Sequence, residues 1–254
     1  MTRTLDGKVV AITGASKGMG RALATLLAAN GARIVALARA SDALDSLALE
    51  LSNKALAIPC DITDPQAITA AMDQAAQRFG RIDALVNNAA SVAVLKVEHA
   101  TDADIQQQYA TNMFGSIYAT RAAIPHLRAA GGGDIVFMSS ESVRMPFPTL
   151  TLYVSSKAAV EGLALGLRQE LRADGTRVTV LRSGAVDTKS VSADWSDEKL
   201  DSFMREAKRL GCLDFSGTYA TPGSMAEALF SVLALPRDVN VDLIEVRARA
   251  PLPE

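Results

Sequence analysis

The sequence contains few of the residues that form disulfides, bind metals or stack on nucleic-acid bases. Its 254 residues include two cysteines, two histidines and one tryptophan, and only 5% are aromatic. The cysteines, Cys60 and Cys212, cannot form a disulfide framework. With only His99 and His126 to join them, they show no metal-ligand spacing. The sequence therefore predicts no metal site and a reducing environment.

An excess of one charge and a long apolar run are missing as well. The 28 acidic and 26 basic residues leave a net charge of -2, too little basic surface for nucleic acid or anionic lipid. The longest uncharged stretch, 105–120, contains three glutamines, whereas a membrane span needs about 20 mainly apolar residues. The chain opens on MTRTLDGKVVAITG, without a basic and then apolar leader. We expect a cytoplasmic protein that binds a small molecule, with no nucleic acid or membrane partner.

Short apolar runs rich in β-branched residues recur between longer helical patterns. The predicted strands cover residues 8–13, 33–38, 55–59, 82–87, 134–139, 177–182 and 239–246. Continuous rather than alternating hydrophobicity indicates strands buried on both faces, and hence a parallel sheet between helices. No linker, repeat or composition shift divides the chain. The sequence predicts a doubly wound α/β fold in a single domain, 1–254.

Two helical segments depart from the ordinary amphipathic pattern. The segment 152–173 is apolar on all faces and includes Gly162 and Gly166, and a helix apolar all round must be buried. One side fits the sheet and the other a helix of a neighbouring subunit, which favours an oligomer; burial within one chain is the alternative. The segment 189–215 carries apolar residues such as Phe203 at helical spacing among charges. It is predicted to be a substrate lid, with an ordinary surface helix as the alternative.

A glycine-rich turn follows the first predicted strand and reads TGASKGMG over 13–20. Glycines let the backbone bend tightly and let a pyrophosphate approach it, while the N–H groups of the next helix face the anion. The turn predicts a dinucleotide site formed by Gly14, Ser16, Lys17, Gly18, Met19 and Gly20.

The end of the second predicted strand bears on the choice of cofactor. A carboxylate at this point binds the ribose hydroxyls of NAD and repels a 2′-phosphate. Here the strand is followed by Arg39, and Lys17 in the glycine-rich turn adds a second positive charge. Arginine offers a planar fork that suits phosphate. The pair favours NADP(H) over NAD(H).

A serine, a tyrosine and a lysine are spaced for proton transfer. Tyr153 lies thirteen residues after Ser140, and Lys157 lies four residues further on, on the same helix face. A phenol has a pKa of about 10, and lowering it to about 7 requires roughly 4 kcal/mol in favour of phenolate. An ammonium group about 4 Å away supplies that much at intermediate dielectric. The spacing predicts Tyr153 as an acid/base group.

These motifs together closely resemble the short-chain dehydrogenase/reductase family over nearly the whole chain. The resemblance rests on TGASKGMG, Asn87-Asn88-Ala89-Ala90, Asn112 with Gly115, Ser140, and YVSSK at 153–157. It implies a Rossmann-type domain with a seven-stranded parallel sheet in the order 3-2-1-4-5-6-7. Helices such as the one containing Tyr153 would join subunits into a dimer or tetramer.

The resemblance also implies individual roles. Tyr153 would be the catalytic acid/base, and Lys157 would lower its pKa and hold the nicotinamide ribose. Ser140 would hydrogen-bond the substrate oxygen, and Asn112 would anchor a water in a proton relay. Further cofactor contacts would come from Asp61 and Ile62 at the adenine, Asn88 and Ala89 in the cleft, and Val186 and Thr188 at the carboxamide.

Two positions depart from the family pattern: Ala90 replaces the glycine of NNAG, and Ser183 replaces the proline of a Pro-Gly turn. We expect both to affect substrate fit or lid mobility rather than remove activity. The stretch 141–152 supplies apolar residues that predict an apolar pocket. Within it, Arg144 either clamps a substrate carboxylate or is a solvated loop residue.

The combined hypothesis is an NADP(H)-dependent oxidoreductase, a short-chain alcohol dehydrogenase or carbonyl reductase, that interconverts a ketone or aldehyde with its alcohol. A cofactor-binding sensor or scaffold without turnover is the alternative; relatives of that kind usually lack the tyrosine or the lysine, and this chain has both. A sugar epimerase would require a longer chain, and no GxSxG elbow supports a hydrolase.

Overall fold

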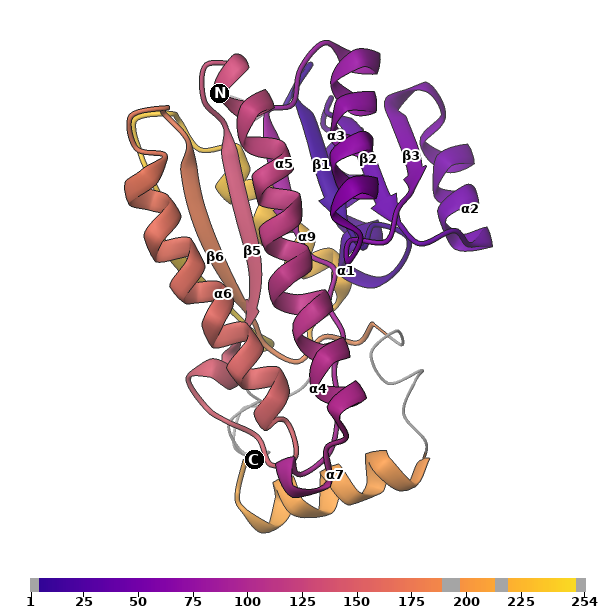
Figure 1. Cartoon of the computed structure of the whole chain (residues 1–254), viewed down its shortest axis with the longest axis vertical. Coiled ribbons are helices and arrows are strands. Elements are labelled where there is room, and N and C mark those ends of the chain that lie inside the picture. The colour runs from indigo at the N-terminus through magenta and orange to yellow at the C-terminus, as the bar shows by residue number, and fades with distance from the viewer. Residues whose placement is uncertain (1–4, 189–196, 213–218, 250–254) are drawn as a thin grey trace.

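The computed structural model describes residues 5–188, 197–212 and 219–249. Its centre is a parallel sheet with the strand order β3-β2-β1-β4-β5-β6-β7 (Figure 1). The strands are β1 (Val9–Thr13), β2 (Arg33–Ala38), β3 (Ala55–Pro59), β4 (Ala84–Asn87), β5 (Asp134–Ser140), β6 (Arg177–Ser183) and β7 (Leu243–Val246). The predicted sheet and its strand order are confirmed.

The central strands are buried along their whole length, as their continuous apolar runs predict. Every residue of β1 and β4 is buried. The predicted boundaries differ most at β7, which begins at Leu243 instead of 239. Just before it, the Asn240 amide donates a hydrogen bond to the Asp242 carboxylate. Residues 239–242 lie outside the strand, and pairing with β6 begins where the Asp242 carbonyl accepts the Val180 N–H at 3.0 Å.

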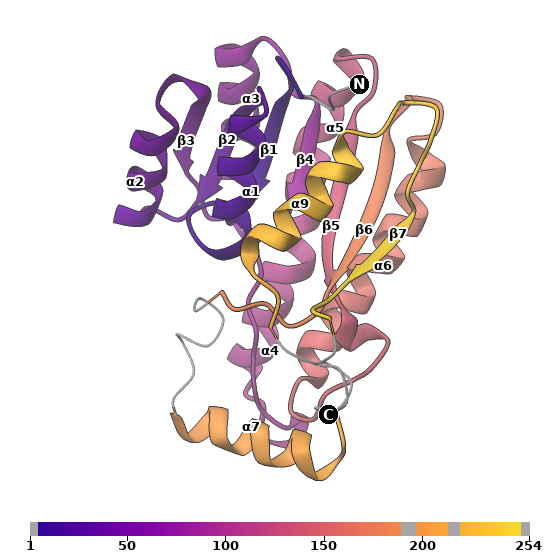
Figure 2. The ribbon, with the colours of Figure 1, turned by 180° about the vertical axis from the view of Figure 1, so that it is seen from behind.

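Helices cover both faces of the sheet (Figures 1 and 2). One layer contains α3 (Pro65–Phe79), α5 (Gly115–Ala129) and α6 (Thr151–Glu170), and the other contains α1 (Gly18–Ala29), α2 (Asp42–Leu51) and α9 (Pro222–Leu233). Successive strand side chains point to opposite faces, so the sheet divides two cores. Phe137 packs in the core under α3, α5 and α6, and Ile12 packs in the core under α1 and α9. The doubly wound α/β fold is thus confirmed.

Helix α6 is not buried on all sides in the single chain. Val160, Ala164 and Leu167 pack into the core, but Leu165 is 62% exposed. A Cβ added at Gly162 or Gly166 would meet open space. Burial of the whole helix within one chain, the alternative to a subunit contact, is therefore wrong. The exposed face carries an apolar side chain between two glycines.

The predicted lid lies partly within the described residues. Helix α7 (Asp197–Arg209) forms inside 189–215, whereas 189–196, with Trp195, and 213–218 lie outside the described residues. Figure 1 shows α7 beyond the carboxyl end of the sheet, apart from the two helix layers. The ring of Phe203 lies 6.2 Å from that of Phe147, between centroids. None of the helices described here combines the length and apolar character that crossing a membrane requires.

Candidate active site

The predicted site residues gather where the direction of strand order reverses. Strand β1 pairs with both β2 and β4, so the connections leaving β1 and β4 diverge to opposite halves of the sheet. In open α/β sheets, ligands bind at this point, outside the carboxyl ends of the strands. The glycine-rich turn follows β1, Asn88 follows β4, and Ser140 ends β5.

The glycine-rich turn requires its glycines. Gly14 and Gly18 have φ angles of +66° and +57°, a left-handed region that other residues adopt at a cost. A Cβ at Gly20 would overlap the carbonyl oxygen of Gly14 and the amide of Asn88. Only glycine at these positions lets the turn follow this path and pack closely against Asn88.

The start of α1 leaves its own donors available. Lys17 occupies the N-cap without a side-chain hydrogen bond, and the first turn of the helix contains no acidic residue. The first N–H groups of a helix have no partner within the helix, and the helix dipole favours an anion beside them. A pyrophosphate supplies that anion, so the turn and helix fit a dinucleotide cofactor.

Asn88 and Ala89 hold the turn in place. The Asn88 side-chain amide donates to the carbonyl oxygens of Thr13, at 2.9 Å, and Gly14, at 3.2 Å. The Thr13 hydroxyl accepts the backbone N–H groups of both Asn88 and Ala89, at 3.0 Å each. These bonds join the ends of β1 and β4. The Asn88 amide thus supports the glycine-rich turn from behind instead of extending freely into the cleft.

The basic residues Lys17 and Arg39 lie at the carboxyl end of the sheet, where the glycine-rich turn also lies. The Ala15 N–H donates to the Leu37 carbonyl, at 3.2 Å, which brings the turn beside the end of β2. Arg39 follows β2 directly, and both it and Lys17 are exposed. No carboxylate occupies the end of β2.

The next strand brings Asp61 and Ile62 to this edge. Hydrogen bonds from the backbone and hydroxyl of Thr63 lower the pKa of Asp61, and the charge of Arg39 lowers it further. Ile62 is 7% exposed and fills the space that a Cβ at Gly115 would need. Its side chain therefore belongs to the core, and only its backbone is left to meet an adenine.

Ser140, Tyr153 and Lys157 come together beside this turn. Ser140 ends β5, and Tyr153 and Lys157 lie one turn apart on α6. The Ser140 hydroxyl hydrogen-bonds the Tyr153 phenol. The Lys157 Nζ lies 5.8 Å from the centre of the Tyr153 ring and donates to the Met138 carbonyl at 2.6 Å. The three side chains that the sequence singles out thus form one cluster.

The electrostatics of this cluster differ from the sequence-based expectation. Burial raises the pKa of Tyr153 to about 12, although the hydrogen bond from Ser140 acts in the opposite direction. Burial also lowers the pKa of Lys157 to about 8. The sequence analysis predicts that Lys157 lowers the pKa of Tyr153, and this lowering is not found in the protein chain by itself. The Lys157 ammonium lies over the Tyr153 ring and donates to the Met138 carbonyl. The cost of desolvating the phenolate therefore outweighs the attraction between the ammonium and the phenolate.

Asn112 ties the loop after β4 to α6. It lies in the π-helical turn η3 (Ala110–Phe114) between α4 (Asp102–Tyr109) and α5. Its amide donates to the Ser91 carbonyl, at 3.0 Å, and to the Ser156 hydroxyl, at 2.9 Å. Its side-chain oxygen accepts the Ser91 N–H at 2.8 Å. Such π-helical turns often occur at functional sites.

The segment after β6 carries Val186 and Thr188. Val186 forms a parallel bridge with Ala220, and the Thr188 N–H donates to the Val186 carbonyl at 2.8 Å. Ser183, the departure from the family's proline, is buried, and its hydroxyl lies 3.7 Å from the Met19 sulfur. The serine thus links the end of β6 to the start of α1.

Glu141 is a buried residue that the sequence analysis does not single out. Its side chain is buried and accepts the Ala185 N–H, and burial raises its pKa. One carboxyl oxygen has no hydrogen-bond partner among the described residues. Glu141 thus joins the loop of Ser140 to the segment of Val186. An acidic residue directly after a buried strand is the signal that could have indicated it.

Arg144 is an exposed loop residue that pairs with a carboxylate. Its guanidinium hydrogen-bonds the Glu245 carboxylate, with nitrogen–oxygen distances of 2.7, 3.1 and 3.2 Å. This ion pair fastens the loop after β5 to β7. Arg144 is therefore an exposed loop residue, as one of the two alternatives states, and its ion pair adds a structural role.

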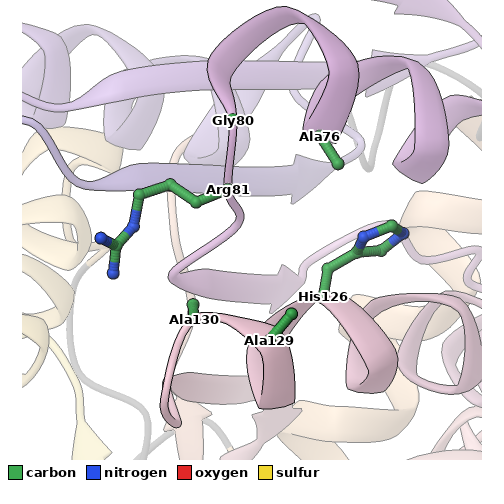
Figure 3. A pocket seen from close by; sticks show the side chains of 6 residues that line it. All are labelled: Ala76, Gly80, Arg81, His126, Ala129 and Ala130. Atoms are coloured by element: carbon green, nitrogen blue, oxygen red, sulfur yellow. The ribbon is translucent and has the colours of Figure 1, made fainter.

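Several apolar residues of the segments on either side of the cluster in sequence are buried, and a separate hollow lies elsewhere. Val94, Leu150 and Leu152 are each less than 10% exposed. A hollow of about 230 Å³ lies between the ends of α3 and α5 (Figure 3), before β4 and β5 begin, whereas Ser140 lies at the carboxyl end of β5. It contains none of the predicted site residues. Across the described ranges, no group of three or more His, Cys, Asp or Glu side chains is arranged to hold a metal.

Comparisons with known proteins agree with this geometry. The family model for short chain dehydrogenase matches residues 8–199. An uncharacterized oxidoreductase of Staphylococcus aureus is 31% identical over 246 residues, covering 96% of this chain and 98% of that protein. One from Staphylococcus saprophyticus is 35% identical over 185 residues, 72% of this chain and 75% of that protein.

Solved structures superpose along nearly the full length. The alcohol dehydrogenase of Thermococcus sibiricus, complexed with 5-hydroxy-NADP, has a TM-score of 0.81 and 27% identity, covering 97% of this chain and 99% of that one. The 3-ketoacyl-(acyl-carrier-protein) reductase of Brucella melitensis, complexed with NADH, has a TM-score of 0.84 and 27% identity, covering 96% and 98%. With its glycine-rich turn, its Ser140–Tyr153–Lys157 cluster and its sheet order, the chain belongs to the short-chain dehydrogenase family and is an oxidoreductase of that family.

Proposed function

We propose that this protein is an NADP(H)-dependent oxidoreductase that interconverts a ketone or aldehyde with its alcohol. The observation that carries the proposal is the cluster of Ser140, Tyr153 and Lys157 beside a turn shaped for a dinucleotide. A tyrosine hydroxyl, a serine hydroxyl and a buried ammonium are the groups that proton transfer at a carbonyl oxygen needs. The Brucella and Thermococcus structures, a reductase and an alcohol dehydrogenase by name, support this reaction class.

In the reduction direction, each residue has a distinct task. When bound, NADPH supplies the hydride that reaches the carbonyl carbon. With its pKa raised to about 12, Tyr153 carries its proton at neutral pH and can donate it to the carbonyl oxygen. The Ser140 hydroxyl can hold that oxygen through a hydrogen bond. Lys157, with a pKa of about 8, is mainly charged at neutral pH and stabilises the phenolate that proton donation leaves.

The reaction is tested with purified protein and a panel of carbonyl compounds. Ethyl 3-oxobutanoate and benzaldehyde serve as probes with NADPH, and L-serine serves with NADP+ because a similar structure is named serine dehydrogenase complexed with NADP+ (TM-score 0.82, 26% identity, covering 97% of this chain and 98% of that one). Absorbance of the reduced nicotinamide follows turnover. We expect cofactor-dependent conversion of at least one probe. Tight NADPH binding with no conversion would contradict the proposal and favour the sensor alternative.

The preference for NADP(H) follows from the charge at the end of β2. Similar structures are complexed with NADH, with NADP+ and with an NADP derivative. The proposed preference for NADP(H) therefore rests on the residues of this chain. Arg39 and Lys17 are exposed at the edge of the glycine-rich turn, where we expect them to bind an adenosine 2′-phosphate. A charge-assisted hydrogen bond to phosphate contributes about 1.5–3 kcal/mol.

We therefore expect the Arg39→Asp, Lys17→Ala double variant to bind NADPH at least about tenfold more weakly, while its affinity for NADH changes by less than about threefold. Titration of nicotinamide fluorescence measures both dissociation constants. Arg172→Asp, an exposed residue just beyond the end of α6, is the matched control and should bind both cofactors normally. Equal weakening for NADPH and NADH would rule out the 2′-phosphate assignment.

The exposed faces of the chain suggest how it assembles and closes. Gly162, Leu165 and Gly166 on α6 form a flat apolar surface that a second helix could cover closely, which supports a homodimer or homotetramer. Sedimentation velocity tests the assembly, and a monomer at micromolar concentration would contradict it.

Segment 189–215 would form a lid on this single catalytic domain, because Phe203 on α7 lies near Phe147 in the loop before the catalytic helix.

A further inference from the structure

Helix α4 buries one polar side chain among exposed ones. Gln106 and Gln107 are exposed, whereas Gln108 is only 1% exposed. A buried amide without partners is costly, so such groups are almost always hydrogen-bonded. The partners of Gln108 therefore indicate what the burial is for.

All of its partners belong to the active-site side of the fold. The side-chain oxygen of Gln108 accepts the Ala93 N–H at 2.7 Å. Its amide nitrogen donates to the Ser91 carbonyl at 2.7 Å and lies 3.4 Å from the Ser156 hydroxyl. Both Ser91 and Ala93 lie in the loop that follows Asn88.

Gln108 and Asn112 grip this loop as a pair. They lie four residues apart, so their side chains leave the same side of the helical segment. Asn112 holds both backbone groups of Ser91, and Gln108 holds the Ser91 carbonyl and the Ala93 N–H. These backbone groups, which lie outside any strand or helix, are thus paired by side chains.

The same network reaches the catalytic helix. Both amides contact the Ser156 hydroxyl, which in turn donates to the Tyr153 carbonyl at 2.7 Å. Further along the loop, the Leu95 N–H donates to the Thr149 carbonyl at 2.9 Å. The loop is therefore connected to α6 at Ser156, beside Lys157, and to the residues that precede Tyr153.

We propose that Gln108 is a positioning residue for the reaction: it fixes the Ser91–Ala93 loop relative to Tyr153 and so sets where the carbonyl substrate lies. This inference rests on the proposed function. Gln108 itself has no contact with the reacting groups, and its effect passes through the loop and Ser156.

The test compares Gln108→Met with Gln107→Met in the full-length protein. Methionine approximates the shape of glutamine but makes none of its hydrogen bonds, and Gln107 is an exposed neighbour bonded only to the Thr111 hydroxyl among the contacts described. With the best probe of the carbonyl panel, we expect Gln108→Met to lose at least about tenfold in kcat/KM, while its dissociation constant for NADPH stays within about twofold. Gln107→Met should match the unmodified protein in both.

Amide hydrogen exchange supplies a readout independent of turnover. We expect the Ala93 amide to exchange at least about tenfold faster in Gln108→Met, with the strands of the sheet unchanged. The proposal is overturned if Gln108→Met matches Gln107→Met in kcat/KM or in Ala93 exchange, or if NADPH affinity and melting temperature fall together with activity. If the unmodified protein converts no probe, the proposed function fails, and the exchange of Ala93 decides alone whether Gln108 holds the loop.

Discussion

Replacing Tyr153 by phenylalanine is expected to reduce kcat for carbonyl reduction by about 10²–10⁴-fold, the range that a general acid contributes. The substitution removes one hydroxyl, which contacts Ser140, and leaves the ring in place. Because Tyr153 carries its proton at neutral pH, the variant lacks the proton that the carbonyl oxygen must receive. The dissociation constant for NADPH should change by less than about threefold.

Tyr109 provides a matched control for this substitution. Its hydroxyl lies 2.8 Å from the Ser155 hydroxyl, at the contact of α4 with α6. Tyr109→Phe removes a hydroxyl of the same kind next to the same helix, so it reports any general disturbance of the packing. Steady-state kinetics and NADPH titration should separate the two variants clearly. If Tyr153→Phe retained the rate of Tyr109→Phe, Tyr153 would not be the proton donor.

Replacing Lys157 by methionine is expected to abolish turnover and, at the same time, stabilise the cofactor-free protein at pH 7. Lys157 is 4% exposed, and burial lowers its pKa from 10.5 to about 8. A shift of this size corresponds to a penalty of about 3 kcal/mol for keeping the group charged. Losing the hydrogen bond to the Met138 carbonyl costs about 1 kcal/mol. The free energy of unfolding should therefore rise by about 2 kcal/mol.

The dependence on pH identifies the cause of this gain. Between about pH 8 and pH 10.5 the unfolded chain binds a proton at Lys157 that the folded chain has lost. Stability of the unmodified protein therefore rises with pH in this window, because the unfolded state binds more protons. The advantage of Lys157→Met should be full below pH 8 and disappear by about pH 10.5.

Urea unfolding at pH 7 and pH 10 measures both effects. Lys208→Met, an exposed substitution on α7, is the control and should change stability little at either pH. A Lys157→Met variant that is less stable at pH 7 than the unmodified protein would show that interactions within the fold offset the cost of burying the ammonium. A variant with normal turnover would remove Lys157 from the reaction. The expected combination, inactive but more stable, is typical of a site in which function opposes stability.

The parts of the fold that follow from local pattern were predictable. Continuous β-branched runs lead to buried parallel strands because both faces must be covered, and the strand order follows from the family resemblance. The glycine-rich turn was equally visible, because Gly14 and Gly18 adopt backbone angles that other residues avoid. The start of β7 was missed because the apolar pattern extends back to Val239, whereas pairing with β6 begins only at Asp242 and Leu243.

The site was predictable as a set of residues but not as a set of interactions. Ser140, Tyr153 and Lys157 were identified by spacing, yet the direction of the tyrosine pKa was wrong. Spacing places an ammonium near a phenol but does not reveal how deeply both are desolvated, or that Lys157 binds the Met138 carbonyl. Gln108 and Glu141 were missed for a related reason. Each is a polar residue in a polar stretch, and only the elements packed over it make it buried.

The sequence by itself therefore determined the α/β class, the placement of the strands and the residues that can carry oxidoreductase chemistry, because these depend on periodicity, on glycine's backbone freedom and on residue type. Only the tertiary structure decided which charges are buried, which amides hold the loop after β4, that Arg144 pairs with Glu245, and which face of α6 is exposed. The physical reason is that desolvation and hydrogen-bond partners arise between segments far apart in the chain, and a local pattern contains no information about what will cover it.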